Sequence, residues 1–152
     1  MATFHIAQYN VARMRAELDD PMMQGFASRL DELNHLADRT PGFVWRHTAN
    51  NEDTSTSLRA YPGDPLVVIN MSVWETIEAL HAFTYRSEHG PMYAARHTWF
   101  EPMEGQTLAL WWVPAGVEPD ASQGKVRLEL LRRRGPSAQA FTFKQRFPPP
   151  ER

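Results

Sequence analysis

The segment from Leu66 to Trp74 constrains the fold most, because its pattern is the strongest strand signal in the chain. It is rich in β-branched residues, which favour extended structure. Successive side chains of a strand point to opposite faces of a sheet. One face carries Val67, Ile69, Met71 and Val73, and the other carries Val68, Asn70, Ser72 and Trp74. Neither set is typical of a solvated surface, so we predict a strand in a sheet that is covered on both sides.

The remaining predicted elements occur in a specific order around this strand. Asp20 and Pro21 suit the N-cap and first position of a helix that ends at Thr40 to Gly42. Strands are predicted at residues 4–11, 43–47 and 107–113, and helices at 75–85 and 119–134. We therefore predict an α+β fold of the ferredoxin-like, split βαβ type, with a four-stranded antiparallel sheet and an extra C-terminal helix. One domain is expected at residues 1–147, followed by a proline-rich tail at 148–152.

The predicted sheet implies a partner. A ferredoxin-like sheet carries its two helices on one face, and residues 66–74 are apolar on both faces. A second copy of the chain is the simplest cover for the other face. We therefore predict a homodimer whose sheets pack face to face.

Gly90 and Pro91 interrupt the segment that follows the helix predicted at 75–85. A proline inside a helix removes a hydrogen bond and costs about 3 kcal/mol. We predict that Pro91 begins a new helical turn, which continues to about residue 100.

Composition excludes several classes of function. The 152 residues carry a net charge of −2 and no cysteine. The charge does not favour nucleic acid or an anionic membrane, and the lack of thiols excludes disulfides and cysteine metal sites. No segment has the length of a transmembrane helix and no signal peptide is apparent, so a cytoplasmic location is expected.

Five tryptophans lie beside polar residues and suggest a small-molecule pocket. Trp45 precedes Arg46, and Trp74 shares a strand face with Asn70 and Ser72. A buried indole N–H needs a partner, and indoles beside converging polar groups line many pockets. The alternative is that these tryptophans are wide core residues. Gln8 and Asn10, which share a face of the first strand, pose the same question.

Several of these segments, taken together, resemble a known family. They include Ala7 to Arg13, Gly42 to Arg46, Val68 to Glu75, Phe83 to His89, Trp99 to Pro102, Leu110 to Gly116 and Gly135 to Phe143. Over nearly the whole chain the sequence resembles domain-of-unknown-function family 3291, in the superfamily of dimeric α/β-barrel proteins. Its relatives include antibiotic-biosynthesis monooxygenases and haem-degrading enzymes. The resemblance implies a dimeric α/β barrel, whereas it implies an activity only weakly because such folds carry many functions.

Three residues after the central strand are candidates for catalysis. Tyr85 and His89 are four residues apart and would share a helical face, which Arg96 would continue if the helix were unbroken. His89 would act as a base, and Tyr85 and Arg96 would hold substrate oxygens. The alternative is a helix whose aromatic residues pack on the sheet while His89 and Arg96 lie at the solvated rim.

The sequence contains no metal-binding motif and no nucleotide-binding loop, so no cofactor is expected. We predict a cofactor-independent, monooxygenase-like enzyme that acts on an aromatic or polyketide-like molecule. The predicted binding residues are Asn10, Trp45, Arg46, Asn70, Ser72, Trp74, Trp99 and Trp112. The alternative is a dimer that binds a small ligand, or haem through His89, without turnover.

Overall fold

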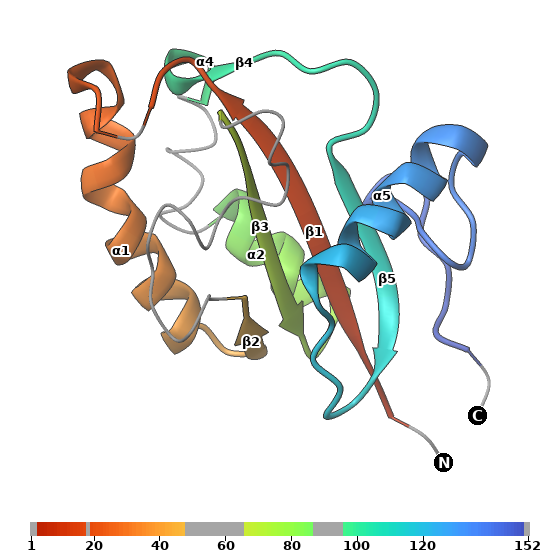
Figure 1. Ribbon diagram of the computed structural model, residues 1–152. Helices are drawn as coiled ribbons and strands as arrows, with labels where there is room; N and C mark the ends of the chain where they lie inside the picture. The colour runs from red at the N-terminus through yellow and green to blue at the C-terminus, as the bar shows by residue number, and fades with distance from the viewer. Residues whose placement is uncertain (1–2, 18, 48–65, 87–95, 151–152) are drawn as a thin grey trace.

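The computed structural model describes residues 3–17, 19–47, 66–86 and 96–150 (Figure 1). Its strands are β1 (Phe4–Met14), β2 (Phe43–Arg46), β3 (Val67–Trp74), β4 (Phe100–Glu101) and β5 (Leu108–Pro114). Its helices are the 3-10 turn η1 (Pro21–Met23), α1 (Gln24–Arg39), α2 (Ile77–Arg86), α4 (Arg96–Trp99) and α5 (Ala121–Arg134). Within the described ranges, no helix has the length and apolar character needed to cross a membrane.

The sheet has the strand order of a ferredoxin-like fold. β5, β1, β3 and β2 lie side by side in that order, and each pair is antiparallel. The predicted α+β fold with a ferredoxin-like sheet is confirmed. The predicted number of strands was wrong, because the described residues already contribute five strands to the sheet. The short strand β4 pairs with Arg13 and Met14, beyond the point where β5 leaves β1.

The two faces of the sheet have different covers. Ile6 packs with Ala37 of α1 and with Ile77 and Leu80 of α2, so this face of β1 lies toward those helices. Side-chain alternation places Gln8, Asn10, Ala12 and Met14 on the same side, which we call the α1/α2 face. The opposite side carries Tyr9 and Trp111, which pack with Leu128 and Leu131 of α5. We call it the α5 face, and Figure 1 shows α5 lying across it over β1 and β5.

The sheet face on which a second copy was expected is already buried within one chain. Leu128 and Leu131 of α5 are at most 1% exposed there, and Ile69 and Met71 of β3 are 2% and 1% exposed. The premise of the face-to-face dimer, an uncovered apolar face, was therefore wrong for the described residues. The extra C-terminal helix supplies the cover over β1 and β5 that a partner was expected to provide.

Close packing of α5 depends on Gly124. A Cβ atom at this position would lie 2.2 Å from Cδ1 and 2.6 Å from Cγ of Tyr9, whose side chain is fully buried. Rotation of the Tyr9 ring does not move Cγ away, so the helix itself would have to shift. The absent side chain is thus what lets α5 approach the sheet.

We predict that Gly124→Ala lowers the free energy of unfolding despite the better helix propensity of alanine. Overpacking costs about 1–3 kcal/mol, and the close approach to a fully buried ring places Gly124→Ala in the upper half of that range. Subtracting the roughly 1 kcal/mol gained in helix propensity leaves an expected net loss of about 1–2 kcal/mol. Urea denaturation measures it, with Val126→Ala on the exposed side of α5 as the control. An unchanged urea midpoint for Gly124→Ala would show that α5 does not pack closely on Tyr9.

The N-terminus of α5 is closed by a capping box. The Asp120 carboxylate accepts hydrogen bonds from Ser122 Oγ at 2.6 Å and from the Gln123 N–H at 2.9 Å. The Gln123 side chain accepts in turn from the Asp120 N–H at 2.8 Å. The Ser122 hydroxyl, and then the Gln123 N–H, hold the pKa of the Asp120 carboxyl below its ordinary value of 3.8.

We predict that Asp120→Ala costs about 1 kcal/mol of stability near neutral pH, as expected for loss of an N-cap. The folded-state pKa of Asp120 is lowered, so its carboxylate stabilises the fold above pH 3.8 and loses this effect as pH falls through the lower folded value. The difference between wild type and Asp120→Ala should therefore shrink in acid. Asp120→Asn keeps the cap without titrating, and thermal melts from neutral pH to pH 3 compare the three proteins.

The C-terminal segment is docked on the edge of the sheet. Phe141 and Leu110 exchange two backbone hydrogen bonds of 2.9 Å, so the chain at Phe141 pairs with β5. Farther along, the Trp112 indole N–H donates to the Phe147 carbonyl at 2.8 Å. The break predicted at Pro91 lies outside the described residues. Before this segment α2 ends at Arg86, and after it α4 begins at Arg96.

Candidate functional site

Four polar side chains cross the middle of the α1/α2 face. The β1–β3 register places Gln8 opposite Ser72 and Asn10 opposite Asn70. Directly opposite residues of antiparallel strands project from the same face, so the four side chains lie together. We call this set, Gln8, Asn10, Asn70 and Ser72, the polar belt.

The belt is linked by hydrogen bonds through Gln8. Its Nε2 atom donates to Asn70 Oδ1 and, at 2.9 Å, to Ser72 Oγ. Ser72 Oγ also accepts from the indole N–H of Trp74 at 2.9 Å. Asn10 Nδ2 donates to the Thr107 carbonyl at 3.2 Å. Gln8 and Ser72 are buried, and these bonds offset the cost of removing their polar groups from water.

The belt is exposed at one point in the middle of the sheet. Asn70 is exposed, whereas every other residue of β3 is buried. β3 is a central strand between β2 and β1, and this face lies toward two helices, so the opening is local. Asn10, opposite Asn70, is partly exposed. A polar floor that opens between covered apolar regions has the character of a small-molecule site.

Apolar clusters flank the belt on both sides. Toward Ile6, the ring of Trp74 lies 5.4 Å from that of Phe43 and 5.1 Å from that of Phe83. Toward Met14, Trp99 packs against Phe26 of α1 at 6.0 Å. Trp74 is 1% exposed and Trp99 is 9% exposed, so both belong to the packed walls of the belt.

Arg46 lies beside the belt at its β2 end. The register places it opposite Ser72, and its guanidinium binds Asp38 of α1 through Nε at 2.9 Å and Nη2 at 3.4 Å. The side chain of Arg46 is 16% exposed. This two-point ion pair ties α1 to the edge of the sheet and places a cation next to the polar floor.

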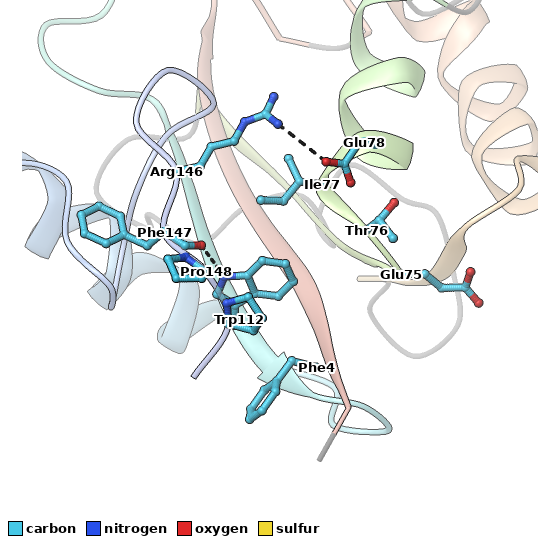
Figure 2. A pocket seen from close by; sticks show the side chains of 10 residues that line it. Phe4, Glu75, Thr76, Ile77, Glu78, Trp112, Arg146, Phe147 and Pro148 are labelled. Carbon is cyan, nitrogen blue, oxygen red and sulfur yellow. Dashed lines mark hydrogen bonds and ion pairs between the residues drawn. The ribbon is translucent and has the colours of Figure 1, made fainter. Parts of the chain in front are cut away.

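Two of the predicted tryptophans lie away from the belt. A register shift between Phe43 and Trp45 places them opposite Trp74 and Val73, so Trp45 packs on the α5 face. Trp112 shares the face of Ile6 but lines a separate cleft of about 400 Å³ at the end of the sheet, between the start of α2 and the C-terminal segment (Figure 2). Arg146 and Glu78 form an ion pair of 3.9 Å at its rim.

The predicted catalytic residues are placed only in part. Tyr85 is exposed, and its ring contacts those of His81 at 4.8 Å and Phe143 at 5.8 Å. An aromatic ring of α2 that does pack against Trp74 is that of Phe83, two positions before Tyr85 and about 200° away around the helix. His89 lies outside the described residues. Arg96 begins α4, and the structure does not describe its side chain.

Gln8 is the one residue of the belt that was not among the predicted binding residues. Its only signal was the alternation that puts it on the face of Asn10. Its contacts with Asn70 and Ser72 depend on the pairing of β1 with β3, more than sixty residues apart. In the described part of the chain, no group of three or more His, Asp or Glu side chains is arranged to hold a metal ion.

Comparison with solved structures finds two similar chains from Nitrosomonas europaea. The protein of unknown function NE2512 is 11% identical, with a TM-score of 0.47 over 79% of this chain and 97% of that chain. A "Putative antibiotic biosynthesis monooxygenase" is 13% identical, with a TM-score of 0.44 over 77% of this chain and 92% of that chain. No curated protein matches the sequence. The fold assignment rests on the strand order of the sheet and not on these two structures.

A family model covers almost the entire chain. The model described as "Domain of unknown function (DUF3291)" matches residues 5–152, which include all four belt residues and the segment that carries His89. The match confirms the resemblance drawn from the sequence motifs. The chain therefore belongs to the DUF3291 family.

Proposed function

We propose that this protein is a monooxygenase-like enzyme that acts, without a bound cofactor, on a planar aromatic or polyketide-like molecule above the polar belt. The observation that carries the proposal is the exposed Asn70 in the middle of an otherwise buried strand. A hydrogen-bonded floor suits substrate oxygens, and the flanking Trp74 and Trp99 clusters suit an apolar ring system.

The belt favours a reaction in which negative charge develops on a substrate oxygen. Amide and hydroxyl groups held in place stabilise an enolate or phenolate as it forms. A base, for which we propose His89, removes a proton from an activated methylene. The carbanion reduces dioxygen, so the methylene becomes a carbonyl and the second oxygen atom leaves as water. The four electrons come from the substrate, and no external reductant is consumed.

The test uses anthrone, an aromatic ketone with an activated methylene, as the substrate. Oxygen uptake and quinone formation in a one-to-one ratio are expected with wild type. Asn70→Ala should lower kcat by about 10²–10³-fold, the usual effect of losing an oxyanion donor. The control is Glu78→Gln at the separate cleft, which should leave the rate unchanged.

Other outcomes separate the alternatives. Saturable anthrone binding without oxygen uptake would assign the protein to the non-catalytic binders. An intense visible absorbance band in the purified protein would indicate haem and would contradict cofactor independence. Wild-type oxygen uptake that Asn70→Ala leaves unchanged would remove the belt from the reaction.

We further propose that the protein is a homodimer, although the α5 face is covered within one chain. A dimer formed with α5 in place must use another surface. Light scattering at micromolar concentration is expected to give twice the chain mass of 17.5 kDa. A mass equal to that of one chain would reject the dimer without affecting the belt.

A further inference from the structure

We infer that Gln8 is a positioning residue that fixes Asn70 and Ser72 as hydrogen-bond donors toward the ligand, so that the belt selects an anionic oxygen. The inference rests on the proposed small-molecule site and specifies the ligand chemistry that this site prefers. It follows from the hydrogen-bonding capacity that remains after the contacts within the belt are made.

Ser72 retains only its proton for a ligand. An indole N–H donates and never accepts, so the bond from Trp74 takes one lone pair of Ser72 Oγ. Gln8 Nε2 takes the second. A hydroxyl has two lone pairs and one proton, and in the described part of the chain the Ser72 proton has no acceptor. Ser72 is therefore left as a donor.

Asn70 is oriented by the same amide group. The second hydrogen of Gln8 Nε2 is directed to Asn70 Oδ1 and holds the carbonyl end of that side chain toward β1. The Nδ2 group of the exposed Asn70 therefore remains for a ligand. A single buried side chain thus sets the polarity of both neighbours, although Asn and Ser can each donate and accept.

Asn10 provides the opposite polarity beside them. Its Nδ2 donates to the Thr107 carbonyl, which leaves Oδ1 as an acceptor. Gln8 makes no hydrogen bond to Asn10 within the described residues, so a change at Gln8 should alter the donors and leave this acceptor in place. Binding through the Asn10 acceptor therefore serves as a control for binding through the Asn70 and Ser72 donors.

The probe is 4-nitrophenol, whose yellow phenolate and colourless phenol are distinguished by absorbance. Phenolate accepts from Asn70 and Ser72, whereas phenol can donate to Asn10. Wild type should bind phenolate about tenfold more tightly than phenol, and the pH at which the bound probe turns yellow should fall by about one unit. The site is located by Asn70→Leu, which removes an exposed donor and should abolish phenolate binding.

The decisive variant is Gln8→Leu, which removes the orienting amide and keeps an apolar side chain of similar size. Phenolate affinity should fall about tenfold while phenol affinity stays unchanged, because the Asn10 acceptor remains. Gln8→Glu replaces the donor by an acceptor, and should turn Asn70 so that its carbonyl faces the ligand and phenol is preferred. Gln139→Leu, on the exposed C-terminal segment, is the control.

The outcomes separate this inference from the proposed function. Equal losses of phenol and phenolate affinity in Gln8→Leu would show that Gln8 only supports the fold, and would overturn the inference. A wild type that binds both forms equally would overturn it as well, with the binding site intact. The small-molecule site itself would be rejected if wild type showed no saturable binding of phenolate, or if Asn70→Leu left that binding unchanged. If Gln8→Leu fails to fold, Asn70→Asp decides, because it keeps the bond from Gln8 and removes the donor.

Discussion

Replacing Trp74 with alanine should lower the free energy of unfolding by about 3–5 kcal/mol, the range for truncating a buried tryptophan. The ring is 1% exposed and lies between Phe43 and Phe83. The substitution leaves a cavity and also removes the donor to Ser72 Oγ. Chemical denaturation followed by circular dichroism measures the loss without depending on tryptophan fluorescence.

Comparison with Trp74→Phe separates packing from hydrogen bonding. Phenylalanine keeps most of the ring volume but lacks the N–H, so a loss of about 1–2 kcal/mol is expected. Trp112→Phe is the matched control, because Trp112 also donates a single hydrogen bond but is only partly buried. If Trp74→Ala is as stable as wild type, Trp74 lines a void that tolerates truncation, and the packed wall described above is wrong.

Local pattern was enough to predict the order of the longer elements, although not the short strand β4. Alternation in Leu66 to Trp74 identified the central strand, and Asp20 does cap the turn that begins at Pro21. These features depend on neighbours a few residues away, which a sequence displays directly. The C-terminal helix was also predicted, but the face that it covers was not. That choice depends on the packing of Leu128, Leu131 and Gly124 against Tyr9.

The candidate site was harder to predict because it depends on strand register. Without a bulge, Phe43 and Trp45 would share a face, since they are two residues apart. The register shift between them turns Trp45 to the α5 face and leaves Arg46 on the face of Ser72. Nothing in the composition of this segment indicates that irregularity. The same dependence on pairing concealed the contacts of Gln8 with Asn70 and Ser72.

Substituting His89 with alanine should lower kcat on anthrone by about 10²–10⁴-fold, the contribution typical of a general base. The melting temperature should remain nearly unchanged if the imidazole serves the reaction and not the packing. Added imidazole should restore part of the rate, because a free base can replace a missing one. Steady-state kinetics and thermal melts of the same preparations measure both properties.

The matched control is His97→Ala, a histidine of α4 that is exposed. Only its backbone carbonyl makes a described hydrogen bond, from Arg15 Nε at 3.0 Å, and the substitution preserves it. Equal, small effects of both substitutions on kcat would remove His89 from the reaction. A large fall in melting temperature for His89→Ala, with normal kcat in the folded fraction, would place His89 in the scaffold. The proposed reaction requires both the base and the polar belt. If His89→Ala and Asn70→Ala each lose activity and each retain stability, the base and the oxyanion donors act in the same reaction.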